Sequence, residues 1–314
     1  MVAQLRKSER GVALLAVLLG VALMTLIVVD FAMTSGLGFV SAANQANELR
    51  ASYLSRSAIN IGLALLAADA RADVKSQTPI DTLSDVWAVP FPPMSLEGGQ
   101  VALSIIDEDR KLNLNSMVQN NVPNQVAIQR MQRLFTILDV NVDLVQGIVD
   151  WITPNTGGGN TNIGDYYMGL KPPYQPRYGA MPTIGDLQMV QGFNEAIFNR
   201  VSPFLTVMPT ASVNANTATP QVIAALEPQL MEDQKIVEEI IAARAIRPFS
   251  QPTDIMNLPD IGDIGQLIGK DVDMRSQFFT ITGTGTYAGA RKIITATFHR
   301  ETNGIGTLGA WHED

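Results

Sequence analysis

The chain has 314 residues, 46% of them hydrophobic and 17% charged, so it can bury one large core or two to three smaller ones. Its formal net charge of -8 disfavours a general nucleic-acid binder, because such proteins cluster Lys and Arg against the phosphates. No cysteine is present and the two histidines are His299 and His312, which excludes disulfides and thiolate metal sites and argues against a Ser-His-Asp triad or a multi-histidine zinc site.

The first thirty or so residues predict a helix that spans a membrane. MVAQLRKSERG is basic on balance, since three basic residues outweigh Glu9, and an uncharged apolar run follows from Val12 to Val29. At 1.5 Å per residue, about 18 residues cover about 27 Å, close to the hydrocarbon thickness of a bilayer. The basic flank predicts a cytoplasmic N-terminus, which places everything after Asp30 on the far side of the membrane.

Three interpretations are open for the role of this segment. It can be an uncleaved signal anchor, or a secretory signal that is cut among the small residues around Ala42. It can also be a prepilin leader, which is cut before the apolar run. A basic leader ending at Gly11, followed directly by VALLAVLLGVALMTLIVV, resembles the N-terminus of type IV pilins and type II secretion pseudopilins. This resemblance implies cleavage by a prepilin peptidase between Gly11 and Val12, and we favour it.

The residue at position five after this cleavage departs from the usual pattern. Counting from Val12, it is Ala16, where most members of the superfamily carry Glu. That Glu is thought to offset the N-terminal amine of a neighbouring subunit in apolar surroundings, where an unpaired charge costs several kcal/mol. The K-type minor pseudopilins of type II secretion are the branch that characteristically lacks it.

Beyond the membrane, residues 46–70 are predicted to continue as a helix with one apolar stripe. The stripe recurs at spacings of four, three and four residues, at Leu54, Ala58, Ile61 and Leu65. Gly36 and Gly38 predict a bend between the two halves, because a glycine inside a helix costs about 1 kcal/mol.

The next segment predicts the start of a sheet. Residues 79–99 are rich in Pro and Gly and predict a loop, and VALSIIDEDRKLNLN predicts a strand, a turn and a second short strand. Asp107 and Asp109 could bind a metal or act as an acid and a base. We favour the simpler interpretation, a charged hairpin tip, because carboxylates one residue apart are common in turns.

The remainder alternates predicted helices with loops and ends in a sheet. Helices are predicted at 124–138, 144–152, 184–198, 221–226 and 232–245, a loop without regular structure at 153–179, and strands at 204–207 and within SQFFTITGTGTYAGARKIITATFHR. Sheet residues thus lie on both sides of a mainly helical block. This order predicts an α+β protein in which a helical domain is inserted.

Four motifs in order extend the resemblance to the whole chain. GIVDWI, YYMGLKPPY, VNANTATPQVIAAL and RSQFFTIT are similar to successive motifs of the K-type minor pseudopilins. The resemblance implies a pilin-like fold, with a long N-terminal helix packed on an antiparallel sheet, and an inserted helical domain similar to sterile-alpha-motif domains. It also implies a structural subunit, not an enzyme.

The same resemblance implies a location and partners. The protein would sit in the inner membrane with its bulk in the periplasm, and at the pseudopilus tip with the I-type and J-type minor pseudopilins. The other pseudopilins, the assembly platform and the prepilin peptidase would be its further partners, and no nucleic acid is expected. The expected segments are a leader (1–11), a transmembrane part (12–33), a periplasmic helix with the first strands (34–116), an inserted helical domain (117–203), a strand with a second helical segment (204–270) and C-terminal strands (271–314).

Calcium is a possible cofactor, since members of this family can bind it in or near the inserted domain. The candidate ligands are Asp150 and Asp165, because the loop after Trp151 is otherwise short of carboxylates. Calcium takes six to eight oxygen ligands, so backbone and Asn oxygens would have to supply most of the shell.

The sequence leaves two rival functions open. The segment from Asn216 to Ile255 resembles a helix-hairpin-helix DNA-binding module, which grips phosphate with the amides of a Gly-rich hairpin; here the hairpin reads Glu-Pro-Gln from Glu227, which adds a negative charge and removes a donor. Lys235, Arg244 and Arg247 are too few to form a basic patch. A carboxylate hydrolase is weaker still, because no nucleophile can be paired with a base.

Overall fold

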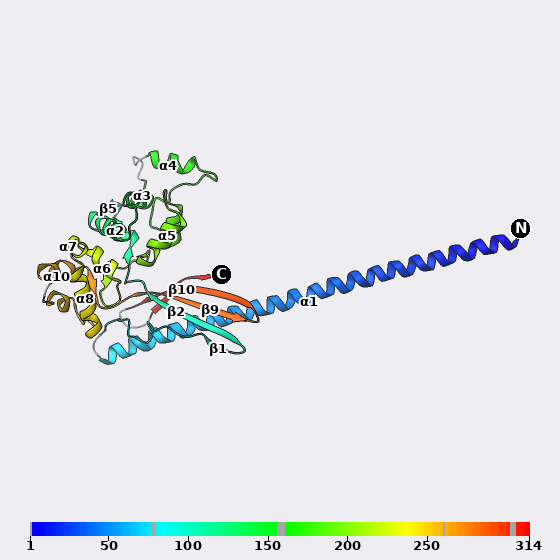
Figure 1. Cartoon of the computed structure of the whole chain (residues 1–314), viewed down its shortest axis with the longest axis horizontal. Coiled ribbons are helices and arrows are strands. Elements are labelled where there is room, and N and C mark those ends of the chain that lie inside the picture. The colour runs from blue at the N-terminus through cyan, green and yellow to red at the C-terminus, as the bar shows by residue number, and fades with distance from the viewer. Residues whose placement is uncertain (1, 77–78, 156–160, 260, 302–305) are drawn as a thin grey trace.

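The computed structural model of the protein describes residues 2–76, 79–155, 161–259, 261–301 and 306–314. A single long helix, α1 (Val2–Ser76), projects from a body made of a sheet and a cluster of helices (Figure 1). Its 75 residues span about 112 Å at 1.5 Å per residue. Only the C-terminal part of α1 lies against the body; the rest extends away from it.

Helix α1 is continuous where we predicted a bend. Gly36 and Gly38 both lie inside its helical hydrogen bonding, and nothing lies within 4 Å of the position that a Cβ would take on either residue. A cost of about 1 kcal/mol per glycine is too small to interrupt a helix of this length. The predicted bend is therefore wrong. The predicted helix at 46–70 is confirmed: Leu54 and Ala58 of its stripe are buried, and Ile61 and Leu65 are partly buried.

The sheet has five antiparallel strands in the order β1-β2-β9-β10-β11. They are β1 (Met94–Leu96), β2 (Gly99–Asp107), β9 (Phe278–Tyr287), β10 (Ala290–Arg300) and β11 (Gly306–Glu313). The predicted C-terminal strands are confirmed as β9 and β10, joined at Ala288 and Gly289, both at positive φ. The predicted hairpin after β2 is wrong, because β2 pairs with β1 and β9, while β3 (Leu112–Asn113) pairs in parallel with β6 (Leu205–Thr206).

Helix α1 and strand β9 lie so close together that two positions of the strand require glycine. A Cβ on Gly283 or Gly285 of β9 would overlap the backbone carbonyl oxygens of Ser55 and Ala51 of α1, respectively. Around this contact lies a compact apolar core of α1, β2, β9 and β10 side chains, in which Ile59, Phe279 and Ile281 are fully buried. The C-terminal part of α1 is therefore a structural part of the body.

A second, larger core holds the helical part together. Its elements are η1 (Leu114–Met117), β4 (Val118–Gln119), β5 (Val122–Pro123), α2 (Gln125–Ile137), α3 (Asp143–Ile152), α4 (Thr161–Met168), η2 (Ile184–Met189), α5 (Glu195–Val201), η3 (Ser202–Phe204), β7 (Val213–Asn214), α6 (Pro220–Leu226), α7 (Pro228–Glu232), α8 (Gln234–Ile246), α9 (Pro252–Met256), α10 (Asp263–Ile268) and β8 (Val272–Asp273). One buried apolar cluster runs from Leu112 to Met274. The α+β class with a helical insertion is confirmed.

Two local predictions in the helical part were wrong. The loop after Trp151 contains α4, whose Tyr167 packs edge-on against the Trp151 ring with centroids 5.2 Å apart. The helix expected at 184–198 is divided into η2 and α5, because Gly192 adopts a φ of 87° and Asn194 caps α5 by accepting a hydrogen bond from the Ile197 amide. The other predicted helices correspond to α2, α3, α6 and α8.

Candidate functional site

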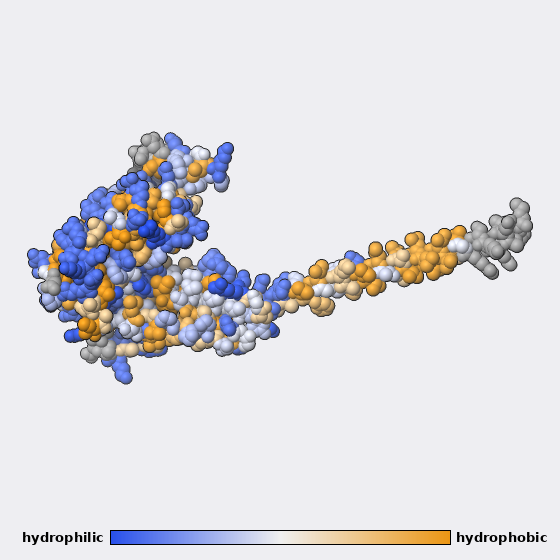
Figure 2. All heavy atoms as spheres, in the orientation of Figure 1, coloured by the Kyte–Doolittle hydropathy of each residue, from blue (hydrophilic) through white to orange (hydrophobic). Residues whose placement is uncertain are grey.

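The N-terminal half of α1 is an apolar rod that no other part of the described chain covers. Large apolar side chains between Val12 and Val40 are exposed, Leu19 for example to 73% (Figure 2). Asp30 is the one charged residue from 12 to 47. A chain exposing this much apolar surface in water would aggregate, so the segment requires lipid or other helices around it.

This rod is long enough to cross a bilayer and to continue beyond it. Helix α1 is the one helix among the described residues that is long and apolar enough for a membrane span. Thr25 donates its hydroxyl to the Val21 carbonyl oxygen at 2.8 Å, which satisfies a polar group within the helix itself. From 12 to 43 the apolar stretch covers about 48 Å, against roughly 30 Å of hydrocarbon, so part of it must lie outside the lipid core.

The residues predicted for processing lie in this rod. Gly11, Val12 and Ala16 all fall within the unbroken α1 and are exposed. Cleavage between Gly11 and Val12 stays a prediction.

A buried polar network joins the sheet to the helical part, where we expected a hairpin tip. Asp107 and Asp109 are exposed by only 1% and 5%, so that interpretation was wrong. Asp107 Oδ2 accepts hydrogen bonds from the hydroxyls of Thr217 (2.5 Å) and Ser276 (2.6 Å). Asp109 Oδ2 accepts from the backbone amides of Gln277 (2.9 Å) and its neighbour Phe278 (2.7 Å).

Burial and mutual repulsion set the protonation of these two carboxyls. Burial, followed by the charge of Asp107, raises the pKa of Asp109 from 3.8 to about 8, and burial raises that of Asp107 to about 6. Both carboxyls are closed off from solvent, and Ser276 and Thr217, which bond to Asp107, are fully buried. The pair therefore connects structural elements rather than forming an acid-base site.

This network makes stability depend on pH. Between about pH 4 and pH 8 the folded protein holds a proton on Asp109 that the unfolded chain has released, so stability must fall as pH rises through that window. For the detergent-solubilised protein we expect Tm to drop by roughly 5–10 °C from about pH 5 to about pH 8.5. Asp109→Asn should make the profile less steep. Asp107→Asn should do so too, because it removes the Asp107 titration and the charge that helps to raise the Asp109 pKa. An equally steep profile in Asp109→Asn protein would contradict this role.

The second half of the network centres on Arg300, at the end of β10. Its guanidinium ion-pairs with Asp81, and Nη1 lies 3.2 Å from Asp69 Oδ2 of α1. It also donates to the Ser276 carbonyl oxygen at 2.8 Å and lies 4.9 Å from the centroid of the Phe279 ring. Arg300 thus links the end of α1, the following loop and the sheet.

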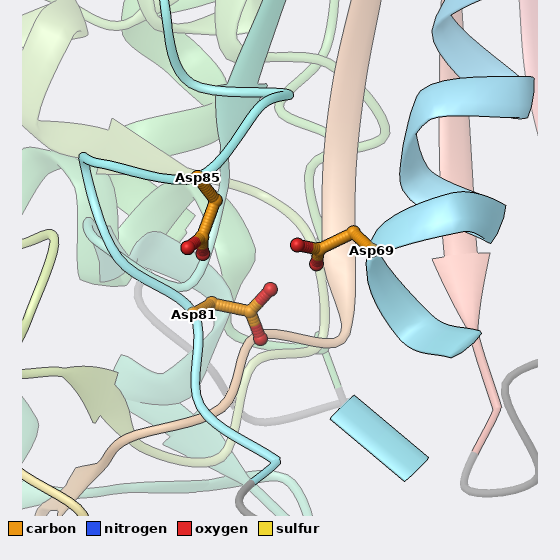
Figure 3. Close-up of side chains that lie close together, drawn as sticks. All are labelled: Asp69, Asp81 and Asp85. Atoms are coloured by element: carbon orange, nitrogen blue, oxygen red, sulfur yellow. The ribbon is translucent and has the colours of Figure 1, made fainter. Parts of the chain in front are cut away.

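Three carboxylates converge beside Arg300. Asp69 comes from α1, and Asp81 and Asp85 come from the loop that follows it (Figure 3). One oxygen of each lies within 4.8 Å of the others. Burial, followed by the charges of Asp81 and Asp85, raises the pKa of Asp69 from 3.8 to about 7.

Sequence reasoning missed this cluster, although one signal for it was present. In β10, Ile294, Ala296 and Phe298 alternate toward the core, and Arg300 continues the same phase. A charged residue at a core position of a strand requires a buried partner of opposite charge. The identity of that partner, Asp81, depends on folding and could not be read from the pattern.

The predicted calcium ligands lie elsewhere. Asp150 is in α3 and accepts a hydrogen bond from Gln146 Nε2 at 2.8 Å, and Asp165 is exposed in α4. Among the described residues, neither belongs to a group of three carboxylates close enough to share an ion. Calcium binding at these two positions stays a prediction.

The helix-hairpin-helix-like segment is packed into the protein. It folds as α6, α7, α8 and most of α9, and Arg133 of α2 donates to the carbonyl oxygens of Ala225 (2.8 Å) and Leu226 (2.7 Å) at the turn after α6. Arg244, one of its few cations, donates to the Ala215 carbonyl oxygen at 2.6 Å. The turn therefore presents carbonyls to arginines of the same chain, and DNA binding is not supported.

Comparisons with known proteins match most of the chain. Family models described as type II secretion system (T2SS), protein K match residues 110–210 and 213–273, together just over half of the chain. The type II secretion system protein K of Pseudomonas aeruginosa is 26% identical, over 96% of this chain and 91% of its own. The protein of that name from Klebsiella pneumoniae is 26% identical, over 80% of each chain.

A solved structure shares the fold. One chain in the crystal structure of the GspK-GspI-GspJ complex from the enterotoxigenic Escherichia coli type 2 secretion system superposes with a TM-score of 0.72, covering 87% of this chain and 99% of that one at 17% identity. The long helix, the antiparallel sheet and the helical insertion are therefore an arrangement that a solved structure also has. The family models, together with the relatives, show that the chain belongs to the type II secretion system protein K family.

Proposed function

We propose that the protein is a minor pseudopilin at the tip of the type II secretion pseudopilus, where it nucleates or caps assembly for export of folded proteins. The observation that carries this proposal is the division of α1. Its N-terminal half exposes apolar side chains to the surroundings, while its C-terminal half is built into the body of the protein (Figure 2). Such a helix both anchors a subunit in the inner membrane and offers an apolar surface to neighbouring helices.

The orientation follows from charge. The basic residues before Gly11 keep the N-terminus in the cytoplasm, and the body lies in the periplasm. A prepilin peptidase cuts between Gly11 and Val12, so the whole apolar rod remains on the mature subunit and meets the assembly platform and other pseudopilins there.

Position at the tip is supported by size and by Ala16. The helical part is joined to the end of the sheet far from the N-terminus (Figure 1). A subunit stacked above this one would have to occupy the space that the helical part fills. At the tip no subunit is stacked above, so no clash arises. A topmost subunit also has no subunit above it whose N-terminal amine needs a carboxylate to neutralise it. An apolar Ala16 then costs less free energy in lipid than an unpaired carboxylate would.

The proposed partners are the I-type and J-type minor pseudopilins, because a relative of the same fold is crystallised in a GspK-GspI-GspJ complex. We expect the three full-length proteins, co-expressed and extracted in mild detergent, to elute as one complex with one copy of each by light scattering. Gold labels on this subunit should mark one end of assembled pseudopili. Labels spaced along the shaft, or a complex that forms equally well without this chain, would contradict the tip assignment.

A further inference from the structure

The carboxylates of Asp69, Asp81 and Asp85 converge at the junction between α1 and the body (Figure 3). The two loop residues are held in place before any ligand arrives. Both oxygens of Asp85 accept hydrogen bonds from Thr82, one from its amide (2.6 Å) and one from its hydroxyl (2.9 Å). The Asp81 amide donates to the Met274 carbonyl oxygen at 2.7 Å. The loop therefore presents a preformed acidic face to the end of α1.

A separate observation points to a ligand at this position. Asp81 has no exposed surface, and its Oδ1 accepts no hydrogen bond from any described residue. Arg300 and the Ser276 amide both bond to the other oxygen, Oδ2. Figure 3 shows the Asp81 carboxylate turned toward Asp69 and Asp85. A buried carboxylate oxygen without a donor is costly, and an ion is one of the few groups that can satisfy it.

The negative charge of this carboxylate group also favours a bound cation. Asp69, Asp81 and Asp85 repel one another electrostatically, while Arg300 is the cation that ion-pairs with Asp69 and Asp81. One guanidinium leaves this half-buried group negative when the carboxyls are ionised. A small divalent cation would balance the charge and reach the oxygens that the guanidinium does not.

We propose that Asp69, Asp81 and Asp85 bind a hard divalent cation, Ca²⁺ by the chemistry of the ligands. All three candidate ligands are carboxylate oxygens, and the group contains neither His nor Cys. Calcium accepts six to eight oxygens in flexible geometry, so water and backbone carbonyls can complete the shell, whereas Mg²⁺ demands a stricter octahedron. The ion would fasten the loop to α1, and so join the membrane helix to the body. This site is distinct from Asp150 and Asp165 and does not depend on the proposed function.

The test uses the full-length protein in detergent, stripped with chelator and titrated with Ca²⁺ alone at about pH 7.5. Saturating Ca²⁺ should raise Tm by about 5 °C or more, and Tb³⁺ should bind with tryptophan-sensitised luminescence that Ca²⁺ displaces. Asp85→Asn is the key variant, because it should leave the fold intact. The asparagine side chain keeps an oxygen that can accept the hydrogen bond from the Thr82 backbone amide. The ion pairs of Arg300 are with Asp69 and Asp81, so the substitution does not break them. It should weaken Ca²⁺ binding at least tenfold and remove most of the Ca²⁺-induced shift.

Two matched controls make the result decisive. Asp150→Asn and Asp165→Asn should keep the full Ca²⁺-induced shift and the luminescence. If Asp85→Asn folds, as judged by its circular dichroism, and still binds Ca²⁺ like the parent protein, the site is overturned. It is overturned equally if the parent protein shows neither a Tm shift nor Tb³⁺ luminescence, or if the Asp150→Asn or Asp165→Asn protein loses both.

Discussion

Replacing Arg300 by Met is expected to lower the free energy of unfolding by about 3–5 kcal/mol, because it leaves a buried charge without its partner. Arg300 is 2% exposed and its guanidinium pairs with the fully buried Asp81. Its loss also leaves the Ser276 carbonyl oxygen without this donor. A methionine fills similar volume, so the loss reports the broken pair and not a cavity. In thermal unfolding of the detergent-solubilised protein, Tm should fall by roughly 10 °C.

The chain offers a matched control for this experiment. Arg56 on α1 also forms an ion pair, with Glu313 at 3.3 Å, but its side chain is half exposed. Arg56→Met should therefore change stability by less than about 1 kcal/mol. Adding Asp81→Asn to Arg300→Met should recover part of the loss, since it removes the orphaned charge. Equal effects of the two single substitutions would refute a dominant role for burial at Arg300.

Gly11→Arg is expected to abolish maturation and with it the assembly of this subunit. Cleavage at the membrane edge requires a small residue immediately before the apolar run, and an arginine there brings both bulk and charge to the scissile bond. Mass spectrometry of the membrane-extracted protein should find a mature chain beginning at Val12 for the parent, and the uncut precursor for the variant. Secretion should then fail although the protein is made and folded.

Gly36→Ala is the matched control, because it alters a glycine of the same helix with nothing within 4 Å of the added methyl group. Processing and membrane insertion should be unchanged in it. A parent protein whose N-terminus is Met1 would identify an uncleaved anchor, and one near Ala42 would identify a secretory signal. Either result would overturn the prepilin interpretation.

Local and periodic features could be predicted from the sequence. The apolar run, the stripe through Leu54 and Ala58, and the alternation in β9 and β10 all reflect burial on one face, which a single segment encodes. The helix α2 begins where expected because Asn124 caps it through the Ala127 amide.

Features that depend on distant partners could not be predicted. Asp107 and Asp109 have the composition of a turn, yet β9 and the helical part enclose them and supply their donors from residues more than a hundred positions away. The same holds for Asp69 and Asp81, whose common partner is Arg300 near the other end of the chain. A pattern of charges along the chain does not tell which of them will be enclosed.

The close contact between α1 and β9 has a mechanical consequence. At Gly283 and Gly285 the carbonyl oxygens of Ser55 and Ala51 lie against the strand, and the two glycines place no side chain of β9 between the two backbones. Axial force on the anchor is therefore transmitted to the sheet as shear across a stiff joint. Rotation of the helix about its own axis would drive the Ser55 and Ala51 carbonyls into β9, so torque is transmitted as well. A movement of the part of α1 that packs on β9 therefore also moves the sheet.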